Sequence, residues 1–178
     1  MSEKKKHLVS LVGTALFCAL TVVISRFLSV NLWNMSIGFS FVPLLLCGML
    51  FGPLWGGVCA ALADLIGALL FPFGPYFPGF TAVALLSGII FGLVGVAAEK
   101  MKRNLSFAAV CTGLLCFKEA FCSLLVNSYW ITLLYGSDYK AVLLSRLPLS
   151  VVTVIFEILF ALLVRTAVLP AIKKSMEK

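Results

Sequence analysis

Four ionisable side chains lie inside long apolar stretches, where a charge is costly unless it is paired or bound to a ligand. They are Asp64, Lys118, Glu119 and Glu157. Counting along each stretch at the helical rise places all four roughly 15–18 Å from the same membrane edge. We expect one polar layer with one of three roles. It is a charge-compensating cluster in which Lys118 pairs with Asp64 or Glu157, a substrate contact led by Asp64, or a proton relay.

A second set of polar and aromatic residues gathers near the opposite ends of the apolar stretches. It comprises Arg26, Asn34, Asn127, Tyr129, Trp130 and Arg146. A guanidinium binds a carboxylate through two hydrogen bonds, so this mixture suits a planar heteroaromatic ligand with an anionic tail. The alternative is a belt of aromatic and arginine side chains at the membrane interface, which is our interpretation for Tyr135 and Tyr139.

The segment PFGPYFPGF, residues 72–80, has three prolines, two glycines, four aromatic residues and no charge. Proline restricts φ and reduces the entropy lost on ordering, and glycine permits turns that other residues resist. One prediction is a stiff lid in which Tyr76, Phe77 and Phe80 stack on a flat ligand. The alternative is a connector whose rings lie among lipid headgroups.

The elements that position these residues are membrane-spanning helices, because the chain is 62% apolar and only 12% charged. The apolar runs predict an all-α integral membrane protein with a single domain, residues 1–178, and an uncleaved first span. The six transmembrane helices are expected at about 8–27, 38–52, 54–71, 79–97, 106–135 and 143–169.

The basic residues indicate how these helices are oriented. Nine of them flank the helix ends on one side, namely Lys4, Lys5, Lys6, Lys100, Lys102, Arg103, Lys173, Lys174 and Lys178. Lysine and arginine accumulate in cytoplasmic segments, so both termini are expected in the cytoplasm. Because these patches flank spans, the net charge of +7 does not indicate a nucleic-acid partner.

Two glycine motifs are present in the sequence, and motifs typical of nucleotide binding and of histidine-based metal sites are missing. The octapeptides at 45–52 and 85–92 each contain Gly-x-x-x-Gly, which lets helix backbones approach closely. There is no P-loop motif, and His7 is the one histidine. We therefore expect no ATP hydrolysis, no metal site, no cofactor and no enzyme activity. The chain is expected to be a binding subunit that needs partners.

Several features together point to a known family. The apolar run 8–27 contains Ala15-x-x-x-Ala19, two small residues on one helix face. In size, in its six spans with both ends inside, and in this motif, the chain resembles the substrate-binding S components of energy-coupling factor (ECF) vitamin transporters. Three stretches are similar to the folate family of S components. They are ADLIGALLFPFGPYFPGFTA, LLVNSYWITLLYG and SRLP.

The resemblance implies a multi-pass protein of the prokaryotic plasma membrane that captures folate from outside with high affinity. It would dock through Ala15 and Ala19 on a T component that works with two cytoplasmic ATPase subunits. Arg146 and Arg26 are then candidates for the folate carboxylates, and Asn127 and Asp64 for the pterin edge. The aromatic candidates in the pocket are Tyr76, Phe77, Phe80 and Trp130.

Two alternatives remain at this point. One is an S component for another small molecule, such as pantothenate, thiamine or a queuosine precursor. The other is a solitary proton-coupled transporter in which Lys118, Glu119 and Glu157 form the relay.

Overall fold

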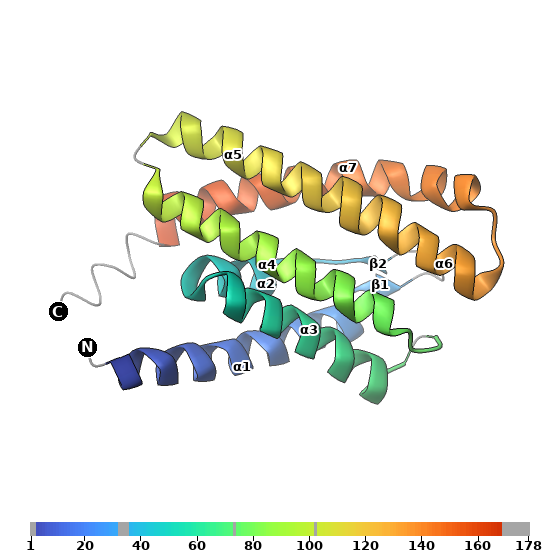
Figure 1. Ribbon diagram of the computed structural model, residues 1–178, viewed down its shortest axis with the longest axis horizontal. Helices are drawn as coiled ribbons and strands as arrows, with labels where there is room; N and C mark the ends of the chain where they lie inside the picture. The colour runs from blue at the N-terminus through green and yellow to red at the C-terminus, as the bar shows by residue number, and fades with distance from the viewer. Residues whose placement is uncertain (1–2, 32–35, 73, 102, 169–178) are drawn as a thin grey trace.

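The computed structural model describes residues 3–31, 36–72, 74–101 and 103–168, which form a bundle of helices that run roughly along one axis (Figure 1). The helices are α1 (Glu3–Phe27), α2 (Phe41–Phe51), α3 (Pro53–Leu70), α4 (Pro78–Lys100), α5 (Asn104–Phe117), η1 (Lys118–Val126), α6 (Asn127–Tyr135), α7 (Tyr139–Leu163) and η2 (Val164–Val168). The segments η1 and η2 are π-helical. They continue α5 into α6 and extend α7, so the prediction of an all-α fold with six helical units is confirmed in the described residues.

Five helices in the described part of the chain are long and apolar enough to cross a membrane. The exception is α2, whose 11 residues extend about 16 Å, half of the ~30 Å hydrocarbon core. The sequence predicted a longer helix at 38–52. Instead, residues 38–40 form a bend and a turn, and the helix starts at Phe41. This turn follows strand β2 (Ser36–Ile37), which pairs antiparallel with β1 (Val30–Asn31).

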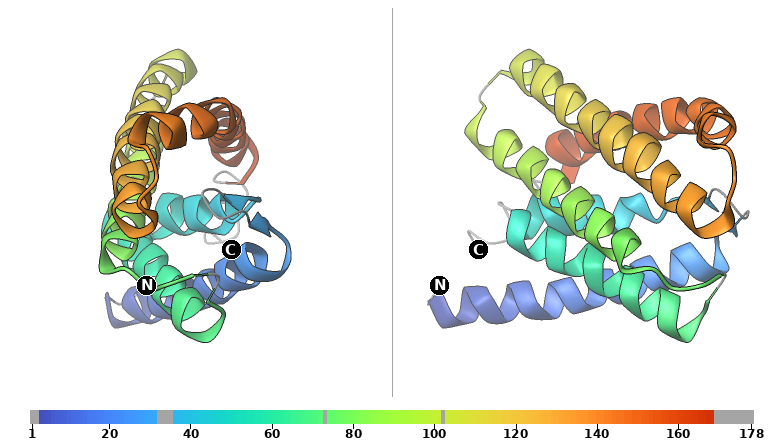
Figure 2. Two further views of the ribbon diagram at one scale, coloured as in Figure 1. Left: turned by 90° about the vertical axis from the view of Figure 1, so that its right-hand side faces the viewer. Right: turned by 45° about the vertical axis from the view of Figure 1, so that its right-hand side comes forward.

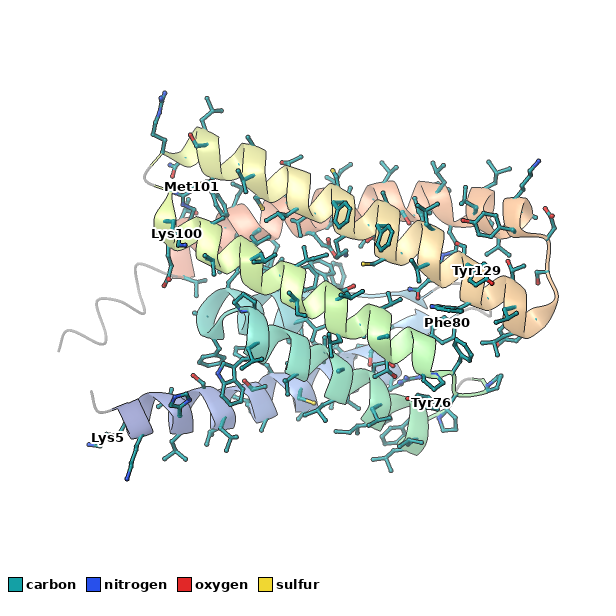
Figure 3. All side chains as sticks on the ribbon, in the orientation of Figure 1. Lys5, Tyr76, Phe80, Lys100, Met101 and Tyr129 are labelled. Carbon is teal, nitrogen blue, oxygen red and sulfur yellow. The ribbon has the colours of Figure 1, made fainter. Side chains whose placement is uncertain are left out.

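Successive long helices run in opposite directions, so the connections gather at two ends of the bundle (Figures 1 and 2). Lys5, Lys100 and Met101 lie at the end where α1 begins, which we call the basic end (Figure 3). Tyr76, Phe80 and Tyr129 lie towards the other end, called the loop end. Helix α1 starts and α7–η2 finishes at the basic end, as an even number of passes requires. The cytoplasmic location of that end stays a prediction.

Four charged residues used for that orientation, Lys102, Lys173, Lys174 and Lys178, lie outside the described residues, as does Asn34.

The start of one helix differs from the prediction and changes the position of a site residue. Helix α7 begins at Tyr139, not at 143, because the Asp138 carboxylate caps it by accepting a hydrogen bond from the Ala141 backbone N–H at 3.0 Å. Arg146 therefore lies two turns inside the helix and not in its first turn. Helix α4 begins at Pro78, a favourable residue for a first helical turn and one residue before the predicted start, so Phe80 lies in the first turn of the helix.

The basic half of the bundle has a dense apolar core between α2, α4, α5 and the end of α7. Its buried residues are Leu45, Met49, Phe91, Val94, Ala97, Phe107, Cys111, Leu115, Ala161 and Val164. A smaller core between α1, α2 and α3 contains Cys18, Cys47 and Cys59. Five of the six cysteines are buried free thiols, as expected for small apolar residues, and Cys116 is exposed.

Glycines allow α2, α3 and α4 to pack backbone against backbone, as the Gly-x-x-x-Gly motifs predicted. A Cβ atom on Gly48 would lie 2.7 Å from the Gly92 backbone nitrogen. One on Gly56 would lie 2.6 Å from the Gly88 carbonyl oxygen. Both distances are too short for a side chain, so these contacts require glycine.

Gly56→Ala is expected to destabilise the bundle by about 1–3 kcal/mol, because the added methyl group must displace backbone of α4. Thermal unfolding in detergent measures the effect. Gly113→Ala is the matched control, since a Cβ on Gly113 meets nothing within 4 Å and alanine favours the helix. Equal loss of stability in both variants would show that close packing at Gly56 is not the cause.

Candidate functional site

A cavity of about 370 Å³ lies between α2, α4, η1–α6 and α7. The apolar core closes it towards the basic end, and Gly38 and Ser40, which precede α2, line it at the other. Its volume falls within the range of small-molecule sites, about 300–1,000 Å³. The cavity is thus the main candidate for a binding site in the described residues.

One wall of the cavity is polar and comes from two neighbouring helices. Along η1 and α6 it contains Glu119, Ser123 and Asn127, each four residues from the next. Along α7 it contains Arg146, Ser150, Thr153 and Glu157, whose spacing of four, three and four keeps them on one helix face. Most polar groups of the cavity therefore lie in two rows on neighbouring helices.

The opposite wall is mainly apolar and comes from α4 and α2. Phe80, Val83, Ala84 and Phe91 line it from α4, and Phe41 and Leu44 from α2. Ser87 is the polar exception on α4. A planar ligand can lie with its face on this wall and its hydrogen-bonding edge towards the polar rows.

Lys118 lies at the inner end of the polar rows and is buried. Its Nζ is 2.5 Å from Glu157 Oε1 and 2.9 Å from Glu119 Oε2, and 5.1 Å from the centre of the Phe91 ring. The predicted charge-compensating cluster therefore exists, with Glu157 and Glu119 as the partners of Lys118. We call these three residues the buried triad.

Asp64 is not part of the buried triad, although it lines the same cavity. Its Oδ2 accepts a hydrogen bond of 2.7 Å from the Thr81 hydroxyl on α4. The Tyr76 hydroxyl lies 3.2 Å from the same Thr81 oxygen. Asp64 thus joins α3 to the start of α4.

Arg26 lines a neighbouring cavity of about 310 Å³, which shares Ser40, Leu44, Asp64 and Ala84 with the first. Its Nη1 donates a hydrogen bond of 3.2 Å to the Phe71 carbonyl oxygen at the end of α3. The guanidinium packs on Gly67, where a Cβ would lie 2.7 Å from Nε. Arg26 and Asp64 are close enough to interact electrostatically.

The aromatic candidates separate into two groups. Phe80 lines the cavity, whereas Phe77 packs on the Trp130 ring at 5.0 Å between ring centres and on Phe80 at 6.2 Å. Tyr76 is 40% exposed, and neither it nor Phe77 nor Trp130 lines the cavity. In the described part of the 72–80 segment, Phe80 therefore lines the cavity, while Phe77 lies beside it and makes edge-on and tilted contacts with Phe80 and Trp130.

Of the eight binding residues predicted from the sequence, the cavity contains Asp64, Phe80, Asn127 and Arg146. The sequence did not decide between three roles for Lys118, Glu119 and Glu157. The hydroxyl groups of Ser87, Ser123, Ser150 and Thr153 were not among the predicted site residues. The spacing of 146, 150, 153 and 157 would have revealed the α7 row. Single hydroxyl residues in apolar helices give no such signal, because they often bond to their own backbone, as Thr153 does to the Leu149 carbonyl oxygen.

Two acceptor atoms of the polar rows are buried without a hydrogen-bond partner among the described residues. They are Asn127 Oδ1 and Glu157 Oε2. A buried polar atom in this state costs about 1–3 kcal/mol, so a bound donor would stabilise each of them. In the described residues, no three His, Cys, Asp or Glu side chains are grouped as a metal site would require.

Ala15 and Ala19 are exposed on α1, beside the stripe of Thr14, Cys18 and Val22 that packs into the bundle. Within this chain, the two alanines are therefore not used for helix packing.

Comparison with known proteins gives a consistent family relationship. Residues 5–172 match the family described as ECF-type riboflavin transporter, S component. The folate transporter FolT of Clostridium novyi (strain NT) is 35% identical over 134 residues, which cover 75% of this chain and 74% of that protein. FolT of Leuconostoc mesenteroides subsp. mesenteroides is 32% identical over 125 residues, which cover 70% of this chain and 64% of that protein.

A solved structure has the same fold. The crystal structure of FolT bound with folic acid superposes with a TM-score of 0.77 at 29% sequence identity, covering 89% of this chain and 93% of the other.

Lys118→Met is expected to lower the free energy of unfolding by about 3–5 kcal/mol, because it leaves two buried carboxylates without their shared cation. Thermal unfolding in detergent without ligand measures the loss. Lys100→Met, at an exposed position of α4, is the control. Adding Glu157→Gln to Lys118→Met should recover part of the stability. No difference between the two lysine variants would show that the buried triad is not a stabilising element.

Proposed function

This chain belongs to the family of ECF-type transporter S components, and we propose that it is the folate-binding subunit of such a transporter. It is a multi-pass protein of the cell membrane, with a role in transport rather than catalysis. The observation that supports folate most directly is the 35% identity to a folate transporter over three quarters of the chain. The cavity adds a flat apolar wall that faces two rows of hydrogen-bonding groups.

Folate combines a planar pterin, a benzoyl ring and a glutamate with two carboxylates. Arg146 is the proposed partner of one carboxylate, since it lines the cavity and offers a bidentate guanidinium. Arg26, in the neighbouring cavity, is the proposed partner of the second. Asn127 Oδ1 would accept an N–H of the ligand, and Phe80 would pack on a ring.

The aromatic residues outside the cavity have a different proposed role. Phe77 supports Phe80 through a ring contact and itself packs on Trp130. Tyr76 bonds to Thr81, which in turn bonds to Asp64. Ordering of the 72–80 segment is thereby connected to groups that line the cavity. We propose that this segment covers the bound ligand.

The proposed partners are a T component and two cytoplasmic ATPase subunits, as is usual for the family. The chain would capture folate, dock on the T component through the exposed Ala15 and Ala19, and release folate inwards. Small side chains permit a close helix contact with the partner, and their exposure on α1 leaves this face available.

Riboflavin is the second candidate ligand, because the matching family is described by it. Riboflavin has a planar ring system but no carboxylate, so it would leave the Arg146 guanidinium without the anion that it suits. Pantothenate, thiamine and a queuosine precursor are further alternatives. Transport by the chain alone in liposomes, driven by a pH gradient without ATP, would contradict the S-component function.

The purified protein is expected to bind folate more tightly than riboflavin, pantothenate or thiamine, and mass spectrometry of the copurified ligand should identify a folate.

Arg146→Ala is expected to weaken folate binding about 10- to 100-fold, because a charge-assisted hydrogen bond is lost. Isothermal titration measures both affinities. Arg103→Ala, exposed at the basic end, is the control. Unchanged folate affinity in Arg146→Ala would show that Arg146 does not hold a carboxylate.

Ala15→Leu and Ala19→Leu should each lower ATP-driven folate uptake by the complete transporter. Overfilling a packed contact costs about 1–3 kcal/mol, which lowers the affinity for the T component by about tenfold or more. Folate binding by the isolated subunit should stay unchanged. Ala109→Leu, an exposed alanine on α5, is the matched control for uptake and binding. Loss of binding in the α1 variants would instead indicate a role of the two alanines in the fold.

A further inference from the structure

The charged groups of the cavity are separated along its length. Arg146 lies about two turns into α7 from the loop end, and Glu157 lies eleven residues further, about 16 Å deeper along the same helix. Lys118 contacts Glu157, so the buried triad marks the inner end of the cavity. The cavity therefore has an arginine near its outer end and two carboxylates at its floor.

The floor has more hydrogen-bond acceptors than donors. A single ammonium, Lys118, bonds one oxygen of Glu119 and one of Glu157. Glu157 Oε2 is buried without a partner among the described residues. The next positive group is Arg146, which interacts electrostatically with Glu119 and donates a hydrogen bond of 3.5 Å to the Ser123 hydroxyl. Buried carboxylates are stable when donors surround them, so the floor has capacity for N–H groups of a ligand.

Asp64 differs from the floor carboxylates in this respect. It accepts a hydrogen bond from Thr81 and faces Arg26 across the neighbouring cavity. Asp64 thus already has a hydroxyl donor, and it interacts electrostatically with the Arg26 guanidinium. Between the two floor carboxylates, Glu119 is the more accessible, with 7% of its surface exposed against 1% for Glu157.

We propose that Glu119 is a specificity-determining residue that accepts N–H groups from the ligand's heterocycle. The heterocycle lies at the floor beside Phe91, and the anionic tail extends outwards to Arg146. This inference rests on the proposed function, since it takes the ligand to be a folate. A ligand placed this way supplies donors to the floor and an anion to Arg146 at the same time.

The chemistry of the floor distinguishes two heterocycles. The aminopyrimidinone end of a pterin presents a ring N–H and an adjacent amino group, two neighbouring donors that match a carboxylate. The corresponding end of riboflavin presents one N–H between two carbonyl groups, whose oxygens would face the carboxylate without a shared proton. An acidic floor therefore selects a pterin over a flavin of similar shape.

A test compares two ligands on two proteins. The ligands are folate and its analogue in which the 2-amino group is replaced by oxygen, which converts one donor into an acceptor. The proteins are the wild type and Glu119→Gln, whose amide keeps the size of the side chain and an oxygen for Lys118. We expect the wild type to prefer folate about 10- to 100-fold and Glu119→Gln to reduce that preference to within about threefold.

Because the preference is a ratio of two affinities on one protein, a general loss of folded protein does not affect it. Glu99→Gln, at an exposed position of α4 near the basic end, is the control and should retain the wild-type preference. Circular dichroism and thermal unfolding establish that each variant is folded.

Three results would overturn the inference. They are equal affinity of the wild type for the two ligands, an unchanged preference in Glu119→Gln, and a preference lost in Asp64→Asn but kept in Glu119→Gln. The last would place the heterocycle at Asp64. The proposed function fails separately, if the wild type binds riboflavin or pantothenate and does not bind folate.

Discussion

Two carboxylates from different helices share one lysine ammonium in the middle of a mainly apolar bundle. Glu119 and Lys118 come from η1 and Glu157 from α7, and these charges are stable at this depth because each carboxylate bonds the same cation. The arrangement fixes the separation of η1 and α7 at one level. On one side of that level the helices meet in the dense core around Phe91 and Phe107, and on the other they diverge around the cavity.

The π-helical turn of η1 contributes to the same arrangement. A π-helix is wider than an α-helix, and such segments occur frequently at functional sites. Here Lys118 and Glu119, adjacent in sequence, are both buried at the cavity floor. Ser123 and Asn127 follow on the same side of the helix. The irregular turn therefore begins where the helix must direct charged groups inwards.

Sequence patterns predicted the properties that depend only on the position of a residue along its helix. The membrane class, the helical units, the common depth of the four ionisable groups and the close approach of glycines were all of this kind. The sequence patterns did not predict how each helix is rotated about its axis, and this rotation decides which side chains meet. Depth alone could not show that Lys118 pairs with Glu157 and Glu119 while Asp64 faces Thr81 and Arg26. The same limit applies to the rings of Phe77 and Trp130, which pack on each other beside the cavity.

The hydrogen bond from Arg26 to the Phe71 carbonyl oxygen ties the end of α1 to the residue that precedes the 72–80 segment. Gly67 leaves room for the guanidinium, since a larger residue would collide with it. Helix α1 is also the helix that presents Ala15 and Ala19 on its outer face. A force applied at those alanines is therefore transmitted along two to three turns of a stiff helix to this contact at the end of α3. Displacement of α1 must either drag this contact along or break it.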